Sequence, residues 1–157
     1  MEYRGEQRTG GRRFAIVAAR FNPHVTEPLV EGALGCFHAS GAAEDDVDVA
    51  WVPGAFELPL VARRLAGSGV YEGVVCIGAV IRGETAHFDH VAREAARGIA
   101  DAARDTGVPV IFGVLTTDTL EQATDRAGGR HGNKGWEAAQ AALETASLLD
   151  RLPKQEG

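Results

Sequence analysis

Short apolar runs alternate along this chain with longer stretches in which apolar residues recur every three or four positions. Most of the short runs lack alternating polar residues, which is typical of strands covered on both faces. Four strands are predicted in this way: Phe14–Ala19, Val47–Val52, Val74–Ile81 and Val110–Leu115. Strands separated by helices pair in parallel through right-handed crossovers. The pattern therefore predicts an α/β fold, a three-layer α/β/α sandwich with a four-stranded parallel sheet.

The longer stretches predict five helices, at about residues 26–40, 56–66, 86–106, 120–127 and 133–152. Thr26 and Thr85 are the expected N-caps of the first and third helices, because a threonine hydroxyl can accept a hydrogen bond from a free first-turn amide. Gly41 and Pro153 are expected to end the first and last helices.

The length and composition indicate one ordinary globular domain. A chain of 157 residues, 45% hydrophobic and 24% charged, is large enough for one sizeable core. We place the domain at 14–152 and a short tail at 153–157. Residues 1–13 carry four arginines among glycines and are expected to form a flexible arm. The net charge of -6 would repel a phosphate backbone, so nucleic acid is not an expected partner.

The apolar runs are too short for a signal peptide or a membrane span, so we expect a cytoplasmic protein without membrane contact. Cys36 and Cys76 fall in a helical pattern and in an apolar strand, as reduced core residues would. No metal-ligand spacing is present; His87 and His90 are three residues apart but lack an evident third ligand.

Every predicted strand is followed at its carboxyl end by polar, aromatic or turn-forming residues. In an open parallel sheet these ends meet at one edge, where ligands bind. Turn formation alone would also select many of these residues. The clusters are 20–22, 53–57, 82–87 and 116–118.

The third cluster, GETAHFDH, predicts an anion site beside a proton-transfer group. Gly83 allows a sharp turn, and the first amides of the following helix would face an anion such as phosphate. His87 would stand in the first turn, where an imidazole can move protons near neutral pH. A histidine at a helix start is also compatible with a simple solvated surface group.

Two glycine-rich segments do not support a nucleotide enzyme. GGRHGNKG lacks the serine or threonine of a phosphate-binding loop, and GSGVYEG lacks the dinucleotide spacing. Phenylalanines 21, 56 and 112 lie at or near strand ends; core packing is their ordinary role. Phe21 has a loop context, however, in which its ring could stack on a planar heterocycle.

Five ordered blocks together resemble the lumazine synthase family over nearly the whole chain from about Phe14 to Leu149. The blocks are RFN, WVPGAFELP, GAVIRGETAHFDHV, FGVLTTDTLEQATDRAG and GNKG. The resemblance implies a flavodoxin-like fold and the penultimate step of riboflavin biosynthesis. That step condenses 5-amino-6-(D-ribitylamino)uracil with 3,4-dihydroxy-2-butanone 4-phosphate to give 6,7-dimethyl-8-ribityllumazine. The family uses no metal and no organic cofactor.

The resemblance also implies roles for individual residues. His87 would transfer protons, Phe21 would stack on the pyrimidine, and Glu57 would accept hydrogen bonds from the ribityl chain. The phosphate would be held by Glu84, Thr85 and Arg126. The remaining substrate-binding positions would be Asn22, Ala55, Phe56, Ala79, Val80, Ile81, Phe112 and Lys134. Of the implied residues, Phe112, Arg126 and Lys134 would reach the site from a neighbouring subunit.

Assembly is part of the resemblance. Family members form pentamers with active sites between subunits, and some pack into 60-subunit icosahedral shells that could enclose riboflavin synthase. The short connection between Arg126 and GNKG favours the shell. The alternatives are a non-catalytic flavin or lumazine carrier, a cage-forming paralogue, and a flavodoxin-like or receiver domain. A receiver domain is disfavoured because Arg20, Phe21 and Asn22 stand where it would carry paired acidic residues.

Overall fold

The computed structural model describes residues 1–154, and its central sheet confirms the predicted α/β fold. Four parallel strands lie in the order β2-β1-β3-β4. Their bounds are β1 (Phe14–Ala19), β2 (Val47–Val52), β3 (Gly73–Ile81) and β4 (Val110–Thr117). Three of the four predicted strands are correct to within a residue. Of these, β1 and β3 lie inside the sheet and are almost wholly buried, as expected for continuous apolar runs. The fourth continues two residues further than predicted.

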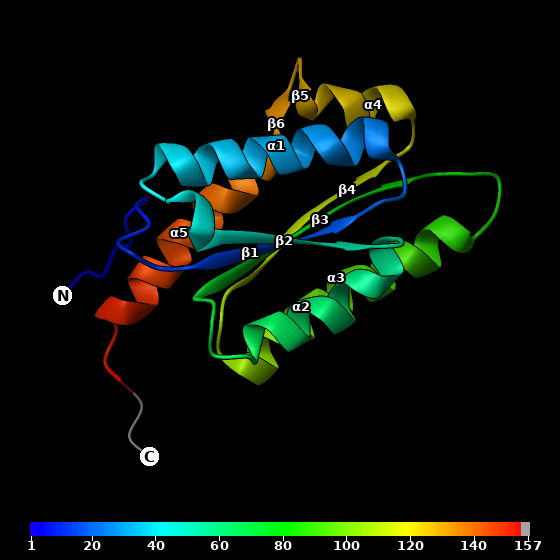
Figure 1. Ribbon diagram of the computed structural model, residues 1–157. Coiled ribbons are helices and arrows are strands. Elements are labelled where there is room, and N and C mark those ends of the chain that lie inside the picture. Colours follow the sequence, from blue (N-terminus) through cyan, green and yellow to red (C-terminus); the bar gives the residue numbers. More distant parts are fainter. Residues whose placement is uncertain (155–157) are drawn as a thin grey trace.

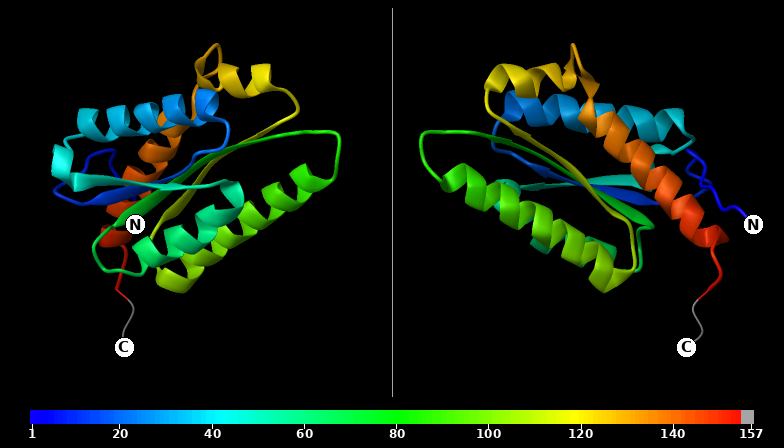
Figure 2. Two further views of the ribbon diagram at one scale, coloured as in Figure 1. Left: turned by 45° about the vertical axis from the view of Figure 1, so that its right-hand side comes forward. Right: turned by 180° about the vertical axis from the view of Figure 1, so that it is seen from behind.

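Two helical layers cover the sheet, as the strand–helix alternation predicted (Figure 1). α1 (Pro23–Ala39) and α5 (Lys134–Arg151) pack together on one face, and α2 (Leu58–Ala66) and α3 (His87–Thr106) on the other. The views of Figure 2 show the same separation of layers from two more directions. The shorter elements are η1 (Glu44–Asp46), η2 (Ala55–Glu57), α4 (Leu120–Asp125), β5 (Ala127–Gly129) and β6 (Gly132–Asn133).

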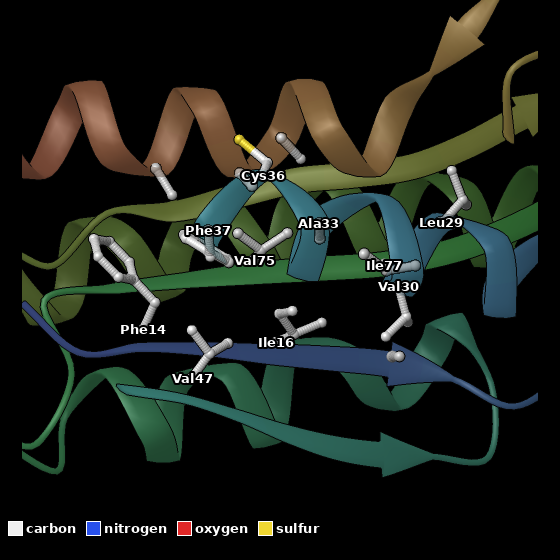
Figure 3. Close-up of a cluster of buried hydrophobic side chains, with 14 of the residues drawn as sticks. Phe14, Ile16, Leu29, Val30, Ala33, Cys36, Phe37, Val47, Val75 and Ile77 are labelled. Carbon is white, nitrogen blue, oxygen red and sulfur yellow. The ribbon is translucent and has the colours of Figure 1, made fainter. Parts of the chain in front are cut away.

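Alternate residues of β1 divide the core into two parts. Phe14 and Ile16 face α1 and α5, whereas Ala15 and Val17 face α2 and α3. Figure 3 shows the first part, in which the side chains of β1 and β3 meet those of α1. Here the rings of Phe14 and Phe37 stack with centroids 4.8 Å apart. The sheet is therefore a rigid platform from which the strand ends project.

Two predicted helix caps are wrong. α1 begins at Pro23, three residues before Thr26, because proline is suited to a first helical position. Thr26 is instead buried inside the helix, and its hydroxyl has no hydrogen-bond partner in the described part of the chain. α3 has Ala86 rather than Thr85 at its N-cap.

The segment 1–13 contains no helix or strand, but it makes contacts that the prediction of a flexible arm did not include. The Glu6 amide donates to Ser147 Oγ, 3.1 Å away, and Arg12 forms an ion pair with Asp150 at 2.7 Å. A hydrogen bond from Arg151 lowers the pKa of the Glu6 carboxyl. These contacts attach the segment to α5, at the end of the molecule away from the carboxyl ends of β1 and β3 (Figure 1).

Candidate active site

A cleft of about 750 Å³ lies beyond the carboxyl ends of β1, β2 and β3. The chain passes from β1 to β2 on one side and later from β3 to β4 on the other, so the strand order reverses between β1 and β3. Such a reversal leaves a crevice in which ligands bind in open α/β sheets. The cleft is lined by Phe21, Asn22, Pro53, Gly54, Ala55, Phe56, Glu57, Ala79, Val80, Ile81, Gly83, Thr85, His87, Phe88, His90 and Val91.

The first wall of the cleft comes from the end of β1. Phe21 is held by its backbone amide, which donates to the Pro53 carbonyl at 3.1 Å, while 70% of the residue remains exposed. Asn22 is the one non-glycine residue between 1 and 154 with a positive φ, 63°. Its Nδ2 donates to the Ala79 carbonyl oxygen at 3.0 Å. This hydrogen bond joins β1 to β3 and fixes the turn that carries the Phe21 ring.

The second wall is the short η2 turn after β2. The Gly54 amide donates to Glu57 Oε1 at 2.9 Å, and the Glu57 amide donates back to the Gly54 carbonyl at 3.2 Å. This reciprocal pair holds the carboxylate at the cleft while Oε2 accepts no hydrogen bond within residues 1–154. Phe56 is 58% exposed. The exposed ring of Phe56 and the available carboxylate oxygen of Glu57 therefore come from consecutive residues on this wall.

The third wall is the connection from β3 to α3, which extends beyond the sheet in all three views (Figures 1 and 2). Residues 82–87 are all exposed, and no side chain caps the helix. The Thr85 hydroxyl instead accepts a hydrogen bond from the His87 amide at 3.4 Å. The start of a 20-residue helix thus faces the solvent beside the His87 ring, an arrangement suited to an anion and a proton-transfer group.

His90, Phe88 and Val91 also line the cleft, although the sequence had not assigned them a role there. Phe88 and Val91 are three positions apart in α3, a spacing typical of the apolar face of a helix, and both are half-buried. His90 follows His87 by nearly one helical turn, which was the signal that could have identified it. No group of three histidines, cysteines or acidic residues suited to a metal occurs in residues 1–154.

The cleft has no cationic side chain of its own among the described residues. Neither lysine nor arginine lines it. Arg82 follows β3 directly, but its Nε donates to Asp118 Oδ1 at 2.8 Å and its Nη1 lies 3.8 Å from Asp89 Oδ1. The hydrogen bond to Asp118 raises the pKa of the Arg82 guanidinium. An anion in this cleft therefore meets backbone amides but no available cation from the same chain.

Four of the sequence-predicted site residues lie outside this cleft lining. Glu84 is on the exposed connection that forms the third wall, and Phe112 lies 37% exposed on the edge strand β4. Arg126 and Lys134 flank the β5–β6 hairpin, where the Lys134 amide donates to the Arg126 carbonyl at 2.8 Å. The fold thus brings Arg126 and Lys134 together, but not into the cleft of their own chain. The other sequence-predicted site residues all line it.

Among the described helices, none combines the length and apolar character required to cross a bilayer.

Comparisons with known proteins identify a matching family and a close relative over most of the chain. A family model described as 6,7-dimethyl-8-ribityllumazine synthase matches residues 11–150. A curated 6,7-dimethyl-8-ribityllumazine synthase from Gemmatimonas aurantiaca is 58% identical to this chain over 150 residues. That alignment covers 96% of this chain and 92% of the relative. The similarity therefore extends over the sheet, both helical layers and all three walls of the cleft.

Proposed function

This chain belongs to the 6,7-dimethyl-8-ribityllumazine synthase family, and we propose that the cleft between β1 and β3 is its active site. The protein is a transferase that forms 6,7-dimethyl-8-ribityllumazine in riboflavin biosynthesis. The proposed substrates are 5-amino-6-(D-ribitylamino)uracil and 3,4-dihydroxy-2-butanone 4-phosphate. The observation that carries the assignment is one cleft that contains exposed aromatic rings, His87 and an uncapped helix start.

The pyrimidine is proposed to stack on Phe21, with Phe56 beside it. Both rings are more than half exposed, and a planar heterocycle would remove this apolar surface from water. The backbone of Ala79, Val80 and Ile81 would read the uracil edge. One N–H of the Asn22 side-chain amide donates to the Ala79 carbonyl, so its second N–H and its Oδ1 acceptor remain for the ligand.

The ribityl chain is proposed to bind along η2, beside Ala55 and Glu57. Glu57 Oε1 is held by the Gly54 amide, which leaves Oε2 to accept from a sugar hydroxyl. A hydrogen bond to a charged acceptor contributes about 1.5–3 kcal/mol. Under this proposal, Glu57 makes one positioning contact, with the Gly54 amide, and one substrate contact.

The phosphate is proposed to lie against the start of α3. Its contacts with Glu84 and Thr85 would use backbone amides, because the Glu84 carboxylate itself would repel a phosphate. The helix dipole favours an anion at this position. His87 would then stand beside the leaving group, where it can give and take protons.

The chemistry requires orientation and proton transfer rather than a strong electrophile. The substrate amine attacks the ketone, water is lost to form a Schiff base, phosphate leaves by elimination, and the second amine closes the ring with loss of water. Holding two reactants in position can contribute roughly 7–11 kcal/mol to such a reaction. His87 is the proposed general acid and base in these steps.

The missing cation is proposed to come from a second subunit. Phe112, Arg126 and Lys134 lie outside the cleft of their own chain, and no arginine or lysine among the described residues lines it. A pentamer in which each chain completes its neighbour's site would supply a guanidinium to the phosphate. We further propose that pentamers assemble into a 60-subunit shell, with riboflavin synthase as an enclosed partner.

The location proposed for the enzyme is the cytoplasm. Both Cys36 and Cys76 are free and buried, as suits a reducing compartment.

The central test mixes both substrates with the purified protein and follows lumazine absorbance. Formation of the lumazine at a rate proportional to protein, and a rate lower by about 10²–10⁴ in the His87→Ala variant, would support the assignment. A carrier or structural paralogue would bind the pyrimidine or assemble without producing lumazine above the uncatalysed rate. That outcome would overturn the proposed active site.

A second test addresses the shared site directly. Co-expressed His87→Ala and Arg126→Ala chains should form mixed pentamers in which about one site in four combines an intact His87 with an intact neighbouring Arg126. When the butanone phosphate concentration is far below the KM of the Arg126→Ala assembly, activity of the mixed particles should therefore exceed that of either parent assembly. Activity no higher than the parents would refute a site made by two subunits.

Light scattering tests the proposed shell and should give a mass near sixty times the 16.6 kDa chain. A mass near five chains would exclude the shell.

A further inference from the structure

Arg82 connects the ends of two strands to the first turn of α3. Its backbone amide donates to the Thr117 carbonyl at 2.8 Å, which extends the pairing of β3 and β4 by one residue. Its Nε donates to Asp118 at 2.8 Å, immediately after β4. The same guanidinium lies 4.5 Å from the centroid of the Phe88 ring and 3.8 Å from the Asp89 carboxylate.

These contacts adjoin the third wall of the cleft, the connection from β3 to α3. Residues 83–86 leave the sheet at Arg82 and join the helix at His87, and the guanidinium contacts the next two helical residues, Phe88 and Asp89. The first fully buried residue of α3 is Ala95, two turns after the helix begins. The start of α3 therefore has little deep packing, and its position depends on contacts such as those made by Arg82.

Arg82 itself is poorly suited to binding the phosphate. It does not line the cleft, and its charge is already opposed by the Asp118 and Asp89 carboxylates. A planar guanidinium can make a hydrogen bond at one edge while its face covers an aromatic ring, which a lysine ammonium cannot do. These properties suit a residue that orients other groups.

We propose that Arg82 is a positioning residue that, through Asp118, Phe88 and Asp89, holds the β3–α3 connection in the geometry that presents His87 and the phosphate-binding amides. The inference rests on the proposed function of this connection. Arg82 and Asp118 act together in this account, since the aspartate fixes the guanidinium against the end of β4.

The test compares Arg82→Ala, Arg82→Lys and Asp118→Asn with the wild type in the two-substrate assay. For Arg82→Ala, kcat/KM for the butanone phosphate should fall about 10- to 100-fold, because misplacement by about 1 Å can cost that much. The KM for the pyrimidine should change less than about twofold, because its proposed contacts lie on the other walls. Lysine should restore only part of the loss. Adding Asp118→Asn to Arg82→Ala should cause little further loss, as expected for one coupled pair.

Arg104→Ala is the matched control. Arg104 forms an exposed ion pair with Asp101 near the C-terminal end of α3, far from the start of that helix. Its removal should leave both kinetic constants unchanged. Melting temperature and particle mass are measured for every variant, and both should remain near the wild-type values because exposed ion pairs contribute little to global stability.

The opposing outcomes are distinct. If Arg82 bound the phosphate directly, Asp118→Asn would release the guanidinium and tighten the phosphate substrate, which would overturn the proposal. Wild-type kinetics in Arg82→Ala, or an equal rise in KM for both substrates, would also overturn it. If Arg82→Ala did not fold, Asp118→Asn alone would test the positioning role. A lower kcat/KM for the butanone phosphate would support that role, and tighter binding of this substrate would overturn it. A wild-type protein that formed no lumazine would instead refute the proposed function on which the inference depends.

Discussion

Replacing Phe21 with alanine isolates the contribution of the stacking surface. The residue is 70% exposed, and its backbone hydrogen bond to Pro53 does not depend on the ring. The substitution should therefore leave folding almost unchanged, since surface changes away from special features usually alter stability by about 0.5 kcal/mol or less. Any loss of affinity then reports the ligand contact itself.

The expected loss follows from the area of the exposed ring. A phenylalanine can bury about 150–250 Å², and a ligand that stacks on one face would cover roughly half of the exposed part. At about 25 cal/mol per Å², this area corresponds to roughly 1.5 kcal/mol. The geometry of an aromatic pair adds about 0.5–1.5 kcal/mol. The total of about 2–3 kcal/mol predicts that Kd for the pyrimidine rises about 30- to 150-fold.

Calorimetric titration with the ribitylaminouracil alone measures this Kd without turnover. Phe21→Leu separates the two contributions, because leucine keeps apolar area but has no flat ring; its Kd should fall between those of the wild type and Phe21→Ala. Leu120→Ala, at a 51% exposed apolar residue outside the cleft, is the control. An unchanged Kd in Phe21→Ala would refute the assignment of the pyrimidine to this wall.

Three substitutions and one labelling experiment test other parts of the structure. His87→Ala should lower kcat by about 10²–10⁴ while the pyrimidine Kd stays constant; wild-type turnover would remove its proton-transfer role. Arg126→Ala should raise KM for the phosphate substrate more than for the pyrimidine, and equal changes would argue against a phosphate contact. Gly113→Ala would place its Cβ 2.7 Å from the Cys76 carbonyl, so calorimetric melting should show about 1–3 kcal/mol of destabilisation. Burial raises the pKa of Cys76 to about 12, so at pH 8 a thiol reagent should label it only upon unfolding, and rapid labelling of the folded protein would contradict this.

The two inner strands, β1 and β3, could be predicted from the sequence because burial on both faces requires continuous apolar residues. The run Phe14–Ala19 is an example: it is buried at every position. The helix starts were harder to predict because several residue types can begin a helix. The first helix begins at Pro23, directly after Asn22 in a left-handed conformation, and not at the predicted N-cap Thr26. The β5–β6 hairpin was not predicted, since strands of two and three residues rich in glycine have no apolar period.

The candidate site was predictable to the extent that its residues follow strands. Phe21, Glu57 and His87 each come after a different strand, so parallel topology alone brings them to one edge. The partners of Arg82 could not be found in this way, because their arrangement depends on how far β3 and β4 extend together. The sequence pattern ended β4 at Leu115, two residues short of the pairing that brings Asp118 to Arg82.

The distribution of charge in the fold gives a physical reason for linking catalysis to assembly. Within the described chain, the cleft supplies amides, aromatic rings and imidazoles but no cation, while Arg126 and Lys134 are gathered on a separate hairpin. A phosphate ligand bound by one chain alone would keep much of its charge uncompensated. A ligand that contacts two chains favours their association, because binding energy that exists only in the assembly stabilises it. Under the proposed arrangement, substrate binding and the subunit contact should therefore strengthen one another.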